Sequence, residues 1–124
     1  MSYKLGTRSK QKLSGVHPDM VAVVELAISI SEVDFTVLEG IRNINRQREL
    51  FKAGKSTTMN SRHITGHAVD LAPWPISWEW EDFYPIADAM KAAAEELEID
   101  IVWGGDWKSF PDGPHFELSR KTYP

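Results

Sequence analysis

The chain has 124 residues, enough for one modest hydrophobic core, and its 42% hydrophobic and 26% charged residues are typical of a single globular domain. The absence of cysteine excludes disulfides, thiolate metal sites and cysteine nucleophiles. A net charge of −4 with no recognition motif argues against nucleic acid, and no apolar run approaches the ~18 residues of a membrane span. The polar start is unlike a secretory signal, so we expect one domain over residues 1–124, made in the cytoplasm and not inserted in a membrane.

The first third of the chain predicts one helix and one strand. Residues 1–16 are polar, and we expect them to be irregular. Helical spacing of apolar residues predicts a helix over 20–31, with Pro18 in its first turn and Asp19 favourable near its N-terminus. We expect His17 to fix this helix start rather than to bind metal. Alternation over residues 34–41 predicts a strand whose end delivers Arg42.

A short helix is predicted over residues 46–53, with Asn45 as its N-cap and Gly54 at C′. A polar loop over 55–62 follows, and Gly66 allows the turn into a strand over 67–72. The span 42–62 carries six basic residues against one acid, Glu49. Most are expected to be solvated; the alternative is a cationic approach to an anionic substrate.

The last third of the chain completes an α+β pattern. Trp74, Trp78 and Trp80 are expected to cap the core, with ligand stacking as the alternative. An apolar stripe predicts a helix over 81–98, followed by strands over 100–103 and 115–118. The fold class is therefore α+β: a single small domain with helices packed on a small, largely antiparallel sheet.

Two short segments supply the residues of a metal site at this sheet. His63 and Asp70 flank the Gly66 turn, and Asp112 and His115 flank Gly113-Pro114. Asp70 lies within the apolar run Ala-Val-Asp-Leu-Ala, where a carboxylate is costly unless it is paired or bound to metal. Two histidines and one carboxylate are the ligands of a catalytic zinc ion that keeps a position open for water.

Two further polar residues, Asp112 and Arg42, suggest that the site hydrolyses its substrate. Asp112 would take a proton from the zinc-activated water and pass it to the leaving amine. Arg42 would bind a substrate carboxylate or the developing oxyanion. Each histidine taken alone has an alternative as a structural residue, and the spacing by itself leaves both interpretations open.

The pattern Ser61-x-His63-x-x-Gly66-x-Ala68-x-Asp70 resembles the signature of the D-Ala-D-Ala carboxypeptidase-like zinc peptidases. Asp112-x-x-His115 resembles their second motif, with Asp where many relatives have Glu. Their upstream arginine segment is similar to Gly40-x-Arg42 followed by Gln47, Leu50, Gly54 and Ser56. The opening Lys-Leu-Gly-x-Arg-Ser and Gly-Val-His-Pro are similar to the phage endolysin branch, which cuts the L-alanyl-D-glutamate bond of peptidoglycan stem peptides. His67 falls at a variable position of the signature.

The resemblance implies one zinc ion per chain, held by His63, Asp70 and His115, with Asp112 as catalytic acid/base. It further implies Arg42 as a catalytic and substrate-binding arginine, and Ser61 as a substrate contact or a turn cap. We expect a monomeric endolysin without a separate cell-wall-binding domain. It would be made in the host cytoplasm and reach the periplasmic wall through a holin-like pore. The alternatives are a D,D-carboxypeptidase or dipeptidase acting at D-Ala-D-Ala, and a non-catalytic metal-bearing binding module.

Overall fold

Four short strands form one antiparallel sheet, in a computed structural model that describes residues 2–56 and 61–124. The strands are β1 (Phe35–Glu39), β2 (Ala68–Pro73), β3 (Ile101–Trp103) and β4 (His115–Leu118), in the spatial order β1-β2-β4-β3. Each neighbouring pair is antiparallel. This confirms the predicted α+β class and all four strand positions to within two residues. A bulge shifts the register of β1 between Val37 and Glu39.

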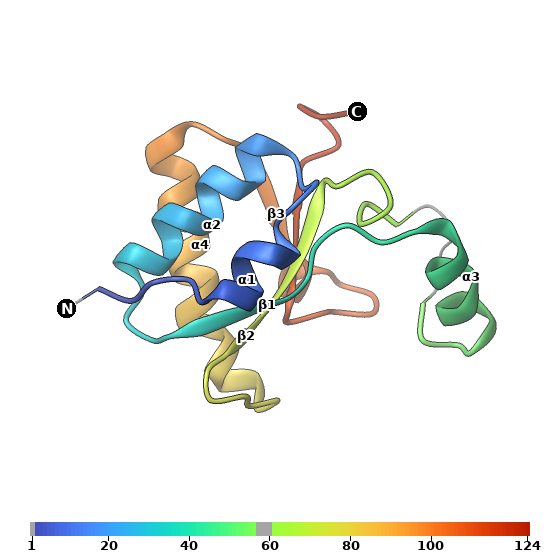
Figure 1. Cartoon of the computed structure of the whole chain (residues 1–124), viewed down its shortest axis with the longest axis horizontal. Helices are drawn as coiled ribbons and strands as arrows, with labels where there is room; N and C mark the ends of the chain where they lie inside the picture. Colours follow the sequence, from blue (N-terminus) through green and yellow to red (C-terminus); the bar gives the residue numbers. More distant parts are fainter. Residues whose placement is uncertain (1, 57–60) are drawn as a thin grey trace.

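Two helices cover one face of the sheet, α2 (Pro18–Ile30) and α4 (Tyr84–Leu97), and they lie together on one side of it in Figure 1. Their inward residues Met20, Val24, Ile86 and Met90 are buried, and so is Phe116 on β4. Because side chains alternate across a strand, this packing leaves Asp70 and His115 on the opposite face. The hydrophobic core thus fixes which face of the sheet carries polar chemistry.

The N-terminal segment is not irregular, as the sequence led us to expect. It forms the short helix α1 (Thr7–Lys12), and Leu13 and Val16 after it enter the core. Buried Ser9 accepts a hydrogen bond from the backbone N–H of Val37 at 2.9 Å, which ties α1 to β1. A helix of six residues is too short to show a repeating apolar stripe, so tertiary contacts decide its structure.

The predicted short helix exists but begins earlier. Helix α3 spans Ile44–Lys52, and its N-cap is Asn43 rather than Asn45: the Asn43 side chain accepts from the Arg46 N–H at 2.8 Å. Gly54 has φ +74°, as predicted for a C′ residue. Figure 1 shows α3 set apart from the other helices, and Gln47 is its one buried residue. Residues 57–60 of the predicted polar loop lie outside the described residues.

Short 3₁₀ turns frame the remaining elements. The turn η1 (Trp80–Phe83) replaces the start of the predicted 81–98 helix, and η2 (Gly104–Asp106) follows β3. Of the predicted core-capping tryptophans, Trp80 stacks on Trp103 with ring centroids 6.1 Å apart, whereas Trp74 and Trp78 are 57% and 65% exposed. Among residues 2–56 and 61–124, no helix has the length and apolar character needed to cross a membrane.

Candidate metal centre and cleft

Residues of three adjacent strands meet across the sheet face that the helices leave open. Asp70 on β2 is paired with His115 on β4 and, beyond a bulge, with Glu39 on β1. Cross-strand partners bring their side chains within about 5 Å of one another. The sheet register therefore places the predicted Asp70 beside the predicted His115, although the two lie 45 residues apart in the chain.

His63 reaches the same place through a tight turn before β2. Gly66 has φ +76°, a conformation that side chains rarely adopt, and a Cβ there would lie 2.7 Å from the Gly15 carbonyl oxygen. The Gly66 carbonyl accepts a 2.8 Å hydrogen bond from the backbone N–H of His17. The His63 carbonyl accepts a 2.9 Å hydrogen bond from the backbone N–H of Arg42. The His17 ring accepts from the Asp19 N–H and so serves as the N-cap of α2, as predicted.

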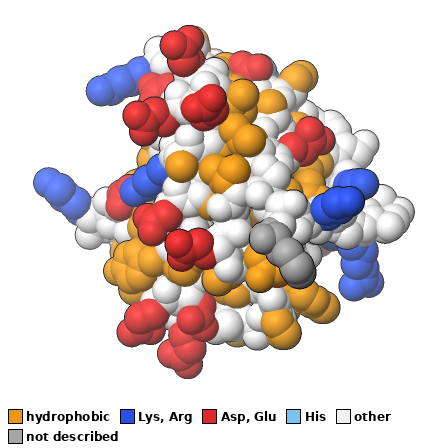
Figure 2. Space-filling view, turned by 90° about the vertical axis from the view of Figure 1, so that its left-hand side faces the viewer, with side chains coloured by type: hydrophobic (Ala, Val, Ile, Leu, Met, Phe, Trp, Pro, Cys, Tyr) orange, Lys and Arg blue, Asp and Glu red, His pale blue; other side chains and the backbone are white. Residues whose placement is uncertain are grey.

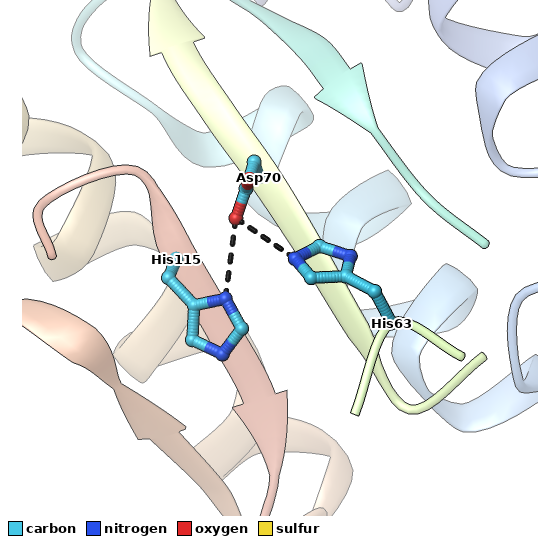
Figure 3. Close-up of side chains that lie close together, drawn as sticks. All are labelled: His63, Asp70 and His115. Atoms are coloured by element: carbon cyan, nitrogen blue, oxygen red, sulfur yellow. Dashed lines mark hydrogen bonds and ion pairs between the residues drawn. The ribbon is translucent and has the colours of Figure 1, made fainter. Parts of the chain in front are cut away.

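The three predicted ligands converge on one carboxylate oxygen. His63 Nε2 lies 3.1 Å and His115 Nδ1 3.2 Å from Asp70 Oδ1 (Figure 3). Both imidazoles are buried, and their ring centroids are 5.1 Å apart. Burial opposes ionisation of Asp70, but the hydrogen bonds from His115 and His63 outweigh it and hold the pKa of Asp70 below its usual range.

This donor set fits a divalent metal ion. One ligand atom from each of His63, Asp70 and His115 lies within 4.8 Å of the other two. Imidazole nitrogens with a carboxylate oxygen suit zinc among the common ions, and three protein ligands match a catalytic rather than a structural site. The three residues that the sequence predicted as ligands are thus the ones that the fold brings together.

Asp112 lies on the loop between η2 and β4, beside the three ligands. Its backbone N–H donates to the Gly104 carbonyl at 2.9 Å, and the Trp103 indole donates to the Gly113 carbonyl at 2.7 Å. These bonds anchor the loop on both sides of the carboxylate. Burial and the nearby negative charge of Asp70 raise the pKa of Asp112 above its usual range.

Arg42 lines the cleft and is held in place by two neighbours. Its guanidinium forms a two-point ion pair with Glu39, and its Nη1 donates to Gln47 Oε1 at 2.7 Å. Burial alone would lower the pKa of Arg42, but Glu39 and the more distant Asp70 and Asp112 raise it. Arg42 therefore presents a fixed positive charge beside the ligand cluster.

The cleft is open, about 940 Å³ in volume, and includes all the predicted site residues. Ser61 lines it, while its Oγ accepts from the His63 N–H at 3.2 Å, so it caps the local turn. Arg62 is not a solvated charge, as the sequence suggested for most of this span. It is buried, and its Nη2 donates to the carbonyls of Leu118 and Tyr123, which fastens the C-terminal tail.

The sequence analysis assigned no role in the site to three of its polar residues. Glu39 and Gln47 hold Arg42, and Glu117 accepts from His115 Nε2 at 2.8 Å. Glu117 carried a usable signal, because a glutamate inside the apolar run His-Phe-Glu-Leu is as conspicuous as Asp70 in its own strand. Gln47 belongs to the segment that resembles the family's arginine motif, but that resemblance assigned it no role of its own.

A small α+β domain with a two-histidine, one-aspartate cluster on its open sheet face has the architecture of a metallopeptidase. The model of the phage L-alanyl-D-glutamate peptidase family matches residues 1–123, and the chain therefore belongs to that family.

Individual relatives agree with this assignment. The chain is 35% identical to the L-alanyl-D-glutamate peptidase of Escherichia phage T5, over 99% of this chain and 94% of that one. The crystal structure of the Serratia marcescens L-Ala D-Glu endopeptidase ChiX is similar with a TM-score of 0.91 and 50% identity, over 95% of this chain and 91% of that chain. The vancomycin resistance D,D-dipeptidase VanXYg shares the fold, with a TM-score of 0.56 and 18% identity, over 83% and 50% of the two chains.

Proposed function

We propose that this protein is a zinc-dependent endopeptidase that hydrolyses the L-alanyl-D-glutamate bond of peptidoglycan stem peptides. The observation that carries the proposal is the convergence of His63 Nε2 and His115 Nδ1 on one oxygen of Asp70 in an open cleft. The family assignment and the relatives' names supply the bond. A zinc ion bound there would activate water and polarise the amide carbonyl.

The protein's own residues divide the remaining work. Asp112, whose raised pKa favours proton exchange, acts as general base and returns the proton to the leaving amine. Arg42 offers its fixed charge to a substrate carboxylate or to the oxyanion. D-glutamate within a stem peptide carries a carboxylate next to the scissile nitrogen, which gives this arginine a partner of suitable charge.

The biological setting follows from this substrate. We propose that the protein acts as an endolysin on the periplasmic wall after synthesis in the host cytoplasm, and that a holin-like pore gives it access. It works as a monomer, with residues 1–124 as one catalytic domain. Ser61 contributes mainly by fixing the His63 turn.

Digestion of purified peptidoglycan, with and without added zinc, tests the proposal. Mass spectrometry should detect stem peptides that begin at D-glutamate, with L-alanine left on the sugar. Release of terminal D-alanine instead would assign the chain to D,D-carboxypeptidase or dipeptidase activity. Intact muropeptides from folded, metal-loaded protein would favour the binding module.

Two variants test the assigned roles. Asp112→Ala should retain the metal and lose cleavage, because the ligands are intact while the proton carrier is gone; full activity in this variant would contradict the role. His63→Ala should lose metal as measured by elemental analysis. Unchanged metal content would refute the ligand assignment.

A further inference from the structure

Glu117 is a buried carboxylate that the proposed reaction does not use. It lies on β4 two residues after His115, so both side chains project to the same face of the sheet. Phe116 and Leu118, between and after them, are fully buried in the core on the other face. Glu117 itself is 8% exposed. A carboxylate this buried is costly unless it has a specific partner.

Its closest partner is the outer nitrogen of a predicted metal ligand, while its other oxygen, Oε2, lies 3.8 Å from Nε of the exposed Arg120. His115 Nε2 lies 2.8 Å from Glu117 Oε1, while His115 Nδ1 lies 3.2 Å from Asp70 Oδ1. A neutral imidazole carries one N–H and one lone pair. In a ring that binds metal through Nδ1, the one hydrogen is on Nε2, where the Glu117 carboxylate accepts it, and the Nδ1 lone pair is directed at the ligand cluster.

The second histidine is oriented in the same way but by a different group. His63 Nδ1 lies 2.7 Å from the Gly40 carbonyl oxygen, which accepts its hydrogen, so that Nε2, 3.1 Å from Asp70 Oδ1, is the nitrogen whose lone pair would bind a metal ion. The two rings thus use different nitrogens toward the cluster, and each outer nitrogen has an acceptor. The acceptor for His63 is a backbone carbonyl, whereas the acceptor for His115 is the side chain of Glu117.

We propose that Glu117 is a positioning residue of the metal centre. It fixes the Nε2–H tautomer and the ring angle of His115, so that Nδ1 is the metal-binding atom. A carboxylate acceptor also makes the imidazole a stronger electron donor, and such outer partners are typically worth 10- to 100-fold in metal affinity. The inference rests on the proposed metal site and adds to it a residue that determines its affinity.

Metal affinity measured on the full chain tests this role. Zn²⁺ is titrated in competition with a chromophoric chelator against wild type, Glu117→Ala and Glu117→Gln. Glu117→Ala should weaken Zn²⁺ binding about 10- to 100-fold, and Glu117→Gln, which keeps an oxygen acceptor, should weaken it less. The matched control is Glu96→Gln, which neutralises an exposed glutamate on α4 and should leave the affinity unchanged.

A second measurement needs no variant and so does not depend on mutant folding. Long-range ¹H–¹⁵N spectra of zinc-loaded wild type should show His115 protonated at Nε2 with Nδ1 bound to metal. Metal on Nε2 would overturn the inference. A Glu117→Ala variant that is folded by circular dichroism and binds Zn²⁺ with wild-type affinity would also overturn it. If wild type itself binds no Zn²⁺, the proposed zinc-dependent function fails together with the role of Glu117. If wild type binds Zn²⁺ and Glu117→Ala binds it equally well, only the role of Glu117 fails.

Discussion

Gln47, the one buried residue of α3, helps Glu39 to position Arg42. Gln47 is fully buried and accepts from Arg42 Nη1 at 2.7 Å, and its own amide nitrogen donates to Ser56 Oγ at 2.7 Å. The remaining residues of α3 are at least partly exposed. Arg46 and Leu50 of the same helix line the cleft, and Gln47 is the side chain that connects the helix to the guanidinium.

Replacing Gln47 should impair catalysis more than stability. Gln47→Met keeps the volume but leaves Nη1 without this acceptor, and hydrogen bonds to charged groups are worth about 1.5–3 kcal/mol. We expect kcat/KM on a soluble muropeptide to fall by roughly 10- to 100-fold. Arg48→Met, an exposed change on the same helix, is the control. Equal kcat/KM in both variants would show that Gln47 does not position Arg42.

His67 makes the fold sensitive to acid without taking part in the site. Its ring lies 5.4 Å from that of His17, and burial together with the charges of Arg62 and His17 lowers the pKa of His67. The unfolded chain, with a histidine pKa near ~6.5, then binds a proton that the folded chain resists, so stability falls as pH drops below that value. This contribution is complete above the unfolded pKa.

His67→Gln should therefore flatten the acid side of the stability profile. Urea unfolding of both proteins is measured between neutral and mildly acidic pH, with a chelator present so that metal release does not contribute. The variant should lose less stability than wild type over this range. Parallel curves would mean that the His67 environment has no effect on folding.

At the scale of elements, the loop that carries Asp112 is closed by a tight contact with Gly104. A Cβ at Gly104 would lie 2.5 Å from the Asp112 carbonyl oxygen and 3.0 Å from His115 Cβ. The first contact is closer than real Cβ atoms tolerate and involves the backbone, and the second is tighter than most real Cβ contacts. The loop and the first residue of β4 therefore depend on a glycine at the end of β3.

Gly104→Ala should displace Asp112 and His115 together. We expect a destabilisation of about 1–3 kcal/mol from overpacking, with a larger proportional loss of activity because two site residues move. Gly6→Ala is the matched control, since a Cβ there meets nothing within 4 Å. Thermal melts and muropeptide turnover are compared for the two variants. A fully active, stable Gly104→Ala protein would refute the close approach.

The elements that the sequence predicted well are those whose pattern is repeated or bounded by a clear signal. The apolar stripes of α2 and α4, and the short apolar strands around Asp70 and His115, each bury several residues in one direction. The cap of α3 was misplaced by two residues, because Asn43 and Asn45 are equally good candidates until the chain direction after β1 is known. Helix α1 was missed because its structure depends on distant contacts such as Ser9 with Val37.

Some residues of the candidate site could likewise be predicted from the sequence, and others could not. Ligand types and spacing made His63, Asp70, His115 and Asp112 candidates, because metal chemistry restricts which residues can serve, and the resemblance to the zinc peptidases assigned their roles. The residues that orient them, Gln47 and Glu117, depend on which side chains meet in space, and local spacing contains little of that information. The same holds for Arg62, whose position in a basic run gave no sign that it would bind the C-terminal tail.

Across the whole molecule, charge is distributed unevenly between the cleft and the helices. Exposed basic residues lie along the cleft, including Lys55 and Lys121. Acidic side chains spread over the opposite side, the left-hand face of Figure 1, which is turned toward the viewer in Figure 2. Exposed glutamates of α2 and α4, such as Glu25 and Glu95, lie on these covering helices. A net charge of −4 therefore coexists with a cationic approach to the cleft.

This asymmetry should orient the protein on a polyanionic wall. Steering of this kind raises encounter rates by about 10-fold or more and weakens as salt shortens the Debye length from about 30 Å at 0.01 M to about 3 Å at 1 M. Wall digestion should slow over that range, while turnover of a small, neutral stem-peptide analogue should change little. Equal salt sensitivity for both substrates would point to an effect on the protein itself.

Charge reversal at the cleft separates steering from net charge. The double variant Lys55→Glu, Lys121→Glu should digest walls several-fold more slowly at low salt and approach wild type at high salt, because it reverses the local field without touching the ligands. The control, Lys4→Glu with Lys10→Glu, makes the same change in net charge at exposed residues of the N-terminal segment, which do not line the cleft. If both double variants slow equally, overall charge rather than its placement governs the encounter. A loss confined to the cleft pair would mean that the basic residues around the cleft direct it toward the stem peptides.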